Sequence, residues 1–288
     1  MMSRVPLSLT ALVLTASIVT AQTPISAPSN RFKPSDDVRL GREAASEVTE
    51  QLPLLRDGQV RSTVASIGRR LVSAIPGEFR HPEFRYTFEV VNVRDINAFA
   101  LPGGPIYVNR GMLEAADDEG EVAGVLAHEI SHVALRHGTA QATRATKYQI
   151  GMVAGAIIGS LIGGRTGNIV SQGTQFGLGT AFLRFGREFE RQADTLGAQI
   201  MARAGYDPRD MADMFRTLER EGGSGGPEWL SDHPNPGNRY EAISREADML
   251  PVDRPRGDSP AFVQMETRLD RLPEAPTTEQ VARARARR

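Results

Sequence analysis

The sequence predicts an α+β fold that is mostly helical and contains one small β-sheet. The stretch 57–74 carries apolar residues at helical spacing. These residues are Val60, Val64, Ile67 and Leu71. The stretches 85–92 and 105–109 are short and rich in strand-forming residues, and apolar positions alternate along the first of them. Long helical patterns combined with a few short strands are typical of the α+β class.

The composition is that of an ordinary globular protein. The chain is 40% hydrophobic and 24% charged, and its formal net charge is −1. This balance shows no bias towards nucleic-acid binding, so we expect no nucleic acid partner. Residues 36–250 are expected to form one domain, and 251–288 a short C-terminal extension that ends in a disordered, arginine-rich tail.

Residues 1–21 are predicted to be a secretory signal peptide. Arg4 precedes a mostly apolar run over 5–19, and Val-Thr-Ala at 19–21 offers a small-residue cleavage site. The run is shorter than the roughly 20 residues of a membrane-spanning helix. We therefore expect a periplasmic protein, with secretion or anchoring by an uncleaved N-terminal segment as the alternatives. The following stretch, 22–35, is rich in Pro, Ser and Thr and is expected to be a flexible lead-in.

The first helices are predicted at 36–51 and 57–74, where they would serve as scaffold. A Pro-Gly-Gly turn at 102–104 then precedes the strand at 105–109. This turn could place that strand at the edge of the sheet, where an extended peptide could pair with it. A plain hairpin explains the same residues equally well, so both interpretations stay open.

The stretch 122–138 contains His128, Glu129 and His132 in the order HExxH. Residues four apart lie on the same side of a helix, so both imidazoles can bind one metal ion while Glu129 lies beside them. A chance occurrence of this pattern is expected in roughly one chain of this length in a hundred. The spacing therefore favours a metal site with hydrolytic chemistry over two unrelated histidines.

The helix that carries this motif is expected to be buried. Asp118 and Glu121 form a candidate capping box at its start, and Gly138 is expected to stop it. Its residues are apolar or small nearly all round. Two buried histidines need polar partners, and one metal ion would satisfy both.

The next clear helix, 187–204, carries a carboxylate on its apolar face. Glu190 lies on that face, whereas Glu188 lies opposite and should be solvated. A buried carboxylate could coordinate the metal, and Asp194, one turn further on, could accept the other ring N–H of a ligand histidine. The alternative is an ordinary salt bridge from Glu190 to an arginine of the same helix.

The remaining histidines carry weaker signals. His233 lies in a proline-rich loop, 231–236, after a glycine-rich hinge at 222–226, and spacing alone does not separate a site role from a plain turn. His137 is expected to be a residue at the C-terminal end of its helix rather than a ligand.

The glycine-laced apolar stretch 150–162 is too short to span a bilayer comfortably. A packed helical hairpin, a mobile flap and a peripheral membrane contact all stay open for it. Two further helices are predicted at 238–249 and 262–272.

With HEISH at 128–132 and EFERQAD at 188–194, the chain resembles the gluzincin family of zinc metallopeptidases that includes the HtpX, Oma and BepA types and the CAAX prenyl proteases. The resemblance extends over 36–250. Within it, 97–112 looks like the family's active-site edge strand, and Asp-His-Pro at 232–234 matches its loop with a histidine near the metal. The resemblance implies a zincin-type metalloprotease fold whose edge strand borders the active-site cleft.

The same resemblance implies the role of each site residue and one Zn²⁺ ion per chain. The metal ligands would be His128, His132 and Glu190. Glu129 would be the general base, and Asp194 would orient a ligand histidine from behind. His233 would be either a transition-state stabiliser or a fourth ligand that keeps the enzyme latent.

The predicted function is that of a zinc metalloendopeptidase that cuts unfolded or misassembled exported proteins in protein quality control. The chain lacks the set of hydrophobic spans of the HtpX and prenyl-protease members and a repeat region after residue 250 like that of the BepA type. The alternative is a chaperone or assembly factor for envelope proteins, with low or latent protease activity. A zinc-stabilised scaffold without activity is less favoured, because no structural site requires Glu129.

Overall fold

The structure is a computed structural model, and the residues that it describes are 22–144, 185–221, 229–230, 233 and 238–287. The predicted signal peptide, the stretch 150–162 and the glycine-rich hinge lie outside the described residues. The helices predicted at 36–51, 57–74 and 187–204 are confirmed as α1 (Pro34–Gln51), α2 (Gly58–Ser73) and α8 (Arg187–Ala204). Short helices also form at η1 (Gly77–Phe79) and α3 (Arg110–Ala115).

The small sheet has three strands in the order β1-β3-β2. Here β1 (Thr87–Val91) pairs in parallel with β3 (Pro105–Asn109), and β2 (Ala98–Ala100) pairs antiparallel with β3. Of the two interpretations left open for 105–109, the edge strand is wrong, because β3 is the middle strand. The turn at 102–104 closes a β2–β3 hairpin, so among the described residues β2 occupies that edge.

The hairpin turn fits closely against α1. Gly103 adopts a φ of 78°, in the left-handed region that favours glycine. A Cβ on Gly103 would also lie 2.8 Å from the Cα of Val38 in α1. Both the turn and its approach to α1 therefore depend on a residue without a side chain.

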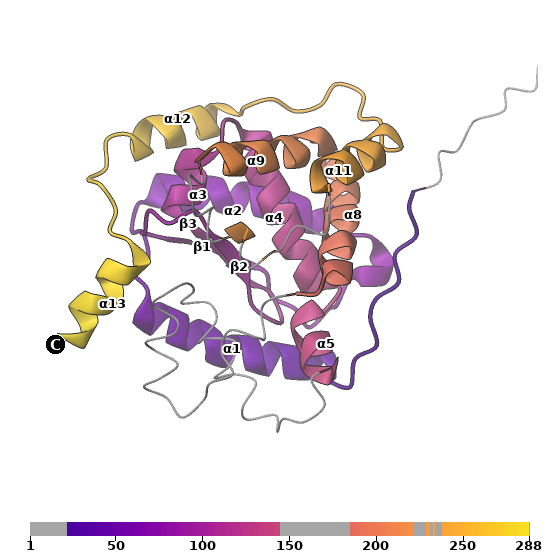
Figure 1. Ribbon diagram of the computed structural model, residues 1–288, viewed down its shortest axis with the longest axis horizontal. Coiled ribbons are helices and arrows are strands. Elements are labelled where there is room, and N and C mark those ends of the chain that lie inside the picture. Colours follow the sequence, from indigo (N-terminus) through magenta and orange to yellow (C-terminus); the bar gives the residue numbers. More distant parts are fainter. Residues whose placement is uncertain (1–21, 145–184, 222–228, 231–232, 234–237, 288) are drawn as a thin grey trace, which may run out of the picture.

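Helix α4 (Glu119–Ala134) runs through the centre of the fold, between the sheet and the helices α8 and α9 (Pro208–Glu221) (Figure 1). Every residue of α4 is buried. Asp118 accepts a hydrogen bond from the Glu121 N–H at 2.8 Å, while the Glu121 carboxylate accepts one from the Asp117 N–H at 2.9 Å. In the predicted capping box the Glu121 carboxylate would accept from the N–H of Asp118, but in the structure it accepts from the N–H of the residue before, Asp117.

The end of α4 differs from the prediction. The helix stops at Ala134, and Arg136 then takes a φ of 57°. Gly138 lies instead inside the next helix, α5 (His137–Arg144). An arginine therefore supplies the left-handed residue that was expected of glycine, and its guanidinium is held by two hydrogen bonds to Asp37 of α1.

Helix α8 packs at close range against α4. A Cβ on Gly197 of α8 would lie 3.3 Å from the backbone nitrogen of His128 and 2.6 Å from Cε of Met211. The missing side chain lets the two helices approach, and this approach carries the residues of the first turns of α8 towards His128 and His132.

The helices predicted at 238–249 and 262–272 are confirmed as α11 (Arg239–Asp248) and α12 (Pro260–Leu269). A further helix, α13 (Thr278–Ala286), was not expected and lies beside the end of α1 (Figure 1). The disordered tail expected within 251–288 is therefore wrong for α13. Its many arginines suggested disorder, but Thr277 and Gln280 form a capping box and Arg283 pairs with Glu279 one turn away.

The segment 22–33 forms neither helix nor strand, but it is hydrogen-bonded to the helical body along its length. The carbonyls of Thr23 and Ser26 accept hydrogen bonds from α8, and Asn30 donates to Thr139 of α5 at 2.7 Å. In Figure 1 this indigo segment runs down beside α8 to the start of α1. None of the helices in the described part of the chain has the length and apolar character needed to cross a membrane.

Replacing Gly197 with valine is expected to lower the free energy of unfolding by about 1–3 kcal/mol, because the new side chain forces α8 away from α4. The control is Gly58→Val, where a Cβ meets nothing within 4 Å, and its effect should stay within about 0.5 kcal/mol. Denaturant unfolding of both variants measures the difference. Equal losses would show that the contact between α4 and α8 has no need of glycine.

Candidate metal centre

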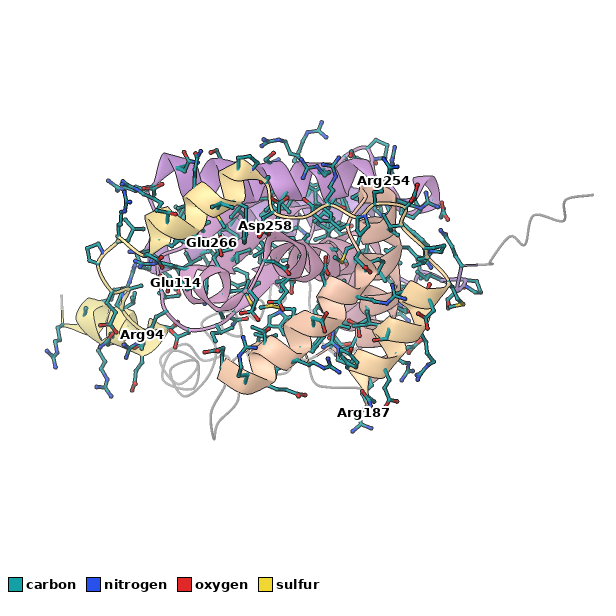
Figure 2. The ribbon with its side chains drawn as sticks, turned by 90° about the horizontal axis from the view of Figure 1, so that it is seen from above. Arg94, Glu114, Arg187, Arg254, Asp258 and Glu266 are labelled. Atoms are coloured by element: carbon teal, nitrogen blue, oxygen red, sulfur yellow. The ribbon has the colours of Figure 1, made fainter. Side chains whose placement is uncertain are left out.

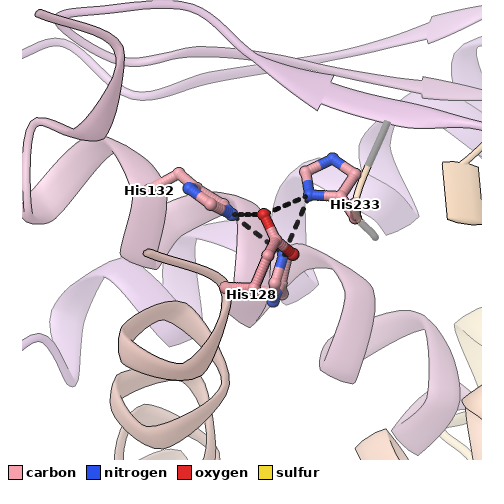
Figure 3. Close-up of side chains that lie close together, drawn as sticks. His128, His132 and His233 are labelled. Carbon is pink, nitrogen blue, oxygen red and sulfur yellow. Dashed lines mark hydrogen bonds and ion pairs between the residues drawn. The ribbon is translucent and has the colours of Figure 1, made fainter. Parts of the chain in front are cut away.

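Four buried side chains from three parts of the chain converge on one point (Figure 3). His128 and His132 come from α4, Glu190 comes from α8, and His233 comes from the segment between α9 and α11. One ligand atom from each lies within 4.8 Å of the others. The structure therefore brings together the three predicted metal ligands and adds His233 to them.

The spacing of these atoms suits a small metal ion. Nε2 of His128 lies 2.9 Å from Nε2 of His132 and 3.2 Å from Nδ1 of His233. Glu190 places Oε2 at 3.4 Å from His128 Nε2 and Oε1 at 3.3 Å from His233 Nδ1. Ligands of a tetrahedral zinc ion, at about 2.0–2.1 Å from the metal, are separated by about 3.3 Å. Four N and O donors at this spacing fit such an ion.

Glu190 is fully buried, at 0% exposure, whereas Glu188 is exposed and pairs with Arg144 at 3.1 Å. The alternative of a salt bridge to an arginine of α8 is wrong. Arg187 projects outward from the start of that helix (Figure 2), and the arginine that faces Glu190 is Arg239 of α11, at 3.3 Å. That ion pair is made by Oε2 of Glu190, which also lies 3.4 Å from Nε2 of His128 but accepts no hydrogen bond of good geometry from the described residues.

A carboxylate and an arginine support His128 from behind. Nδ1 of His128 lies 3.0 Å from Oδ1 of Asp194, whose other oxygen accepts a hydrogen bond from Nε of Arg239 at 2.9 Å. Burial opposes the charged form of His128, but the hydrogen bond to Asp194 and the neighbouring carboxylate of Glu190 raise its pKa to about 9. The same two carboxylates would stabilise the positive charge of a metal ion.

Asp194 remains ionised although it is buried. Burial disfavours its charge, but the Arg239 guanidinium and the hydrogen bond from His128 hold the pKa of its carboxyl below the usual range. Arg239 is itself only 1% exposed, and it also donates to the backbone carbonyl of His233 at 3.2 Å. The role of Arg239 was not predicted from the sequence, although this residue lies one turn before the apolar Ile243 and so on the buried face of its helix.

His132 has a neutral partner. Nδ1 of His132 lies 2.9 Å from Nδ1 of His137. His137 was expected near a helix C-terminus; it begins α5 instead, because α4 stops at Ala134. Its ring stacks on Phe189 with centroids 4.4 Å apart. Burial lowers the pKa of His132 well below its usual value and that of His137 to about 3, so both rings are neutral.

Glu129 lies beside the four converging residues and is held by a tryptophan. Nε1 of Trp229 donates to Oε1 of Glu129 at 3.1 Å, and the Trp229 ring stacks on His233 with centroids 4.9 Å apart. Trp229 is the only tryptophan in the chain and is buried. It was also missed from the sequence, where its place four residues before His233 was the available signal.

A narrow crevice reaches His132 from the surface. It is lined by Ala100, Leu101 and Pro102 on the sheet side and by His132 and Phe185 on the other. The edge of the sheet that borders the site is therefore the end of β2 and the turn after it.

Comparison with known proteins gives one family. Residues 59–247 match the model described as Peptidase family M48. The beta-barrel assembly-enhancing protease of Escherichia coli (strain K12) is 30% identical over 223 residues, which are 75% of this chain and 45% of that protein. Its namesake in Yersinia pestis is 30% identical over 80% of this chain and 48% of its own length. The mitochondrial metalloendopeptidase OMA1 of Bos taurus is 32% identical over 57% of this chain and 32% of its own length. The chain thus spans less than half the length of these curated relatives.

Replacing Glu190 with glutamine is expected to weaken zinc binding by more than the roughly 10–100-fold that loss of a ligand's hydrogen-bond partner costs. Glu188→Gln, two residues away on the exposed side, should leave zinc binding unchanged. Zinc content after dialysis and competition with a chelator measure both. Equal zinc affinity of the two variants would remove Glu190 from the ligand set.

Proposed function

The chain belongs to peptidase family M48, and from this premise we propose that it is a zinc metalloendopeptidase that hydrolyses peptide bonds of unfolded or misassembled exported proteins. The observation that carries the proposal is the convergence of His128, His132 and Glu190 next to the buried carboxylate of Glu129. A structural metal site would need no such carboxylate beside its ligands.

Zinc is the proposed metal because of the chemistry of the donors. Two neutral imidazoles and one carboxylate are the ligand set of many catalytic zinc sites, which keep one further position open. The potential ligands form one group in the described part of the chain, which supports one ion per chain.

The proposed mechanism assigns separate tasks to the residues around the metal. A bound zinc ion would polarise the scissile carbonyl and lower the pKa of a water molecule. Glu129 would take the proton from the attacking water and pass it to the leaving amine. The hydrogen bond from Trp229 fixes one oxygen of Glu129, and Asp194 keeps the His128 ring in the tautomer whose Nε2 faces the metal.

We further propose that the resting enzyme is latent and that His233 is the reason. His233 is 4% exposed, and its Nδ1 lies at ligand spacing from both His128 and Glu190. An imidazole in this position would occupy the site that water or substrate needs. The other interpretation, in which His233 stabilises the transition-state oxyanion, requires its ring to face the substrate rather than the three ligands.

The proposed substrates are extended segments of exported proteins. A leader-like sequence at 1–21 supports export to the periplasm. The name of the bacterial relatives, beta-barrel assembly-enhancing protease, supports substrates among envelope proteins. The burial of the whole cluster also favours the second candidate, an assembly factor that binds such chains and cuts rarely. A metal assay combined with casein digestion separates the two, because the assembly factor would suppress aggregation without cleavage.

Glu129→Gln is expected to keep zinc and the fold but to lower casein cleavage by about 10²–10⁴-fold, because it removes the base without touching a ligand. Zinc content and thermal unfolding serve as controls on the same preparation. A variant that digests casein at the wild-type rate would overturn the proposed mechanism.

His233→Ala is expected to raise the cleavage rate of an unfolded substrate, because it frees the position that the imidazole occupies. The measurement compares turnover of the variant and the wild type at saturating zinc. A fall on the order of 10²–10³-fold would instead assign His233 to oxyanion stabilisation. Unchanged turnover would remove His233 from the site.

A further inference from the structure

A chain of three hydrogen bonds connects His132 to the N-terminal segment. Nδ1 of His132 lies 2.9 Å from Nδ1 of His137, and Nε2 of His137 lies 3.1 Å from Oε1 of Gln192 in α8. Nε2 of Gln192 then donates to the backbone carbonyl of Ser26 at 3.0 Å. The two histidines are buried, and Gln192 is half-buried at the outer end of the chain.

The direction of every bond in this chain follows from its outer end. A backbone carbonyl can only accept, so the Gln192 side chain must turn its NH₂ group towards Ser26 and its oxygen towards His137. That oxygen can only accept as well, so the neutral His137 ring carries its proton on Nε2. Its Nδ1 is then an acceptor, and His132 must donate from Nδ1.

The consequence reaches the metal site. A His132 ring with its proton on Nδ1 has the lone pair of Nε2 free, and Nε2 is the atom that lies 2.9 Å from His128 Nε2 and 3.6 Å from Glu190. The opposite tautomer would direct an N–H at the metal position. The carbonyl of Ser26 therefore selects, through two side chains, the form of His132 that can bind a metal.

We propose that His137 and Gln192 are positioning residues for the metal ligand His132, and that the N-terminal segment 22–33 is part of the metal site's support because its Ser26 carbonyl ends the chain. The inference rests on the proposed metalloendopeptidase function. The two ligand histidines then have hydrogen-bond partners of different charge. His128 is backed by the anionic Asp194, and His132 by a neutral chain, so only one ligand gains added basicity from a charged neighbour.

The same segment offers an internal control. Gln199 lies about two turns further along the same face of α8. Its Nε2 also donates to a backbone carbonyl of the segment, that of Thr23, at 2.9 Å. Among the described residues, no hydrogen bond joins its oxygen to a metal ligand, and its Nε2 also donates to Glu246 at 3.2 Å. Gln192 and Gln199 thus make the same kind of bond from the same helix, and only the Gln192 bond continues to His132.

The test measures zinc affinity by chelator competition, and the visible absorption of the cobalt-substituted protein, in full-length wild type and three variants. Gln192→Leu breaks the chain and is expected to weaken zinc binding about 10-fold, at the lower end of the effect of losing a ligand's hydrogen-bond partner. Gln192→Glu keeps an acceptor for His137 but loses the N–H that donates to Ser26, so its zinc affinity should lie between those of wild type and Gln192→Leu. Gln199→Leu should leave both the affinity and the cobalt spectrum unchanged.

Thermal unfolding of the metal-free variants checks that Gln192→Leu and Gln199→Leu lose similar stability. The proposal is overturned if these two bind zinc equally well, or if Gln192→Glu is as weak as Gln192→Leu. If either result occurs while the wild-type protein still binds zinc, only the proposal for Gln192 and His137 fails, and the proposed metalloendopeptidase function stands. A wild-type protein that binds neither zinc nor cobalt would overturn both proposals.

Discussion

The contact between α4 and α8 is the constraint on which the rest of the structure depends. Neither helix contains a complete metal site, since α4 supplies two imidazoles and α8 supplies the carboxylates. Gly197 lets the α8 backbone approach that of α4 at His128. With the distance between the helices fixed there, Glu190 and Asp194 reach opposite sides of the same imidazole, at 3.4 Å and 3.0 Å.

This arrangement gathers negative charge in the interior, and one arginine balances it. Arg239 pairs with Asp194 through two nitrogens, faces Glu190 and lies over the ring of Phe215 at 4.1 Å. Removing one partner of a buried ion pair typically costs about 3–5 kcal/mol, because the other charge is left uncompensated. The stability of the fold and the electrostatics of the site therefore depend on the same guanidinium. Because Arg239 belongs to α11, its ion pairs also hold α11 against the site.

The parts of the site that follow helical geometry could be predicted from the sequence, and the parts that depend on tertiary contacts could not. The angular position of Glu190 relative to Glu188 is a property of one helix, and so the sequence distinguished the buried carboxylate from the exposed one. His137, Arg239 and Trp229 gain their roles only when other helices meet them. The strand β2 was not predicted, because three residues, Ala-Phe-Ala, are too few to show an alternating pattern. Since β2 pairs with 105–109, that stretch is the middle strand of the sheet and not its edge.

Trp229 gives the protein a built-in optical reporter. It is the only tryptophan in the chain, it is 1% exposed, and its indole stacks on His233 while its N–H is bonded to Glu129. The tryptophan fluorescence of the protein therefore comes from one indole that contacts both Glu129 and His233. Any event that separates His233 from the indole, such as entry of a peptide, changes the surroundings of that one fluorophore. Conformational exchange at this site can thus be followed in the unlabelled, unmodified chain.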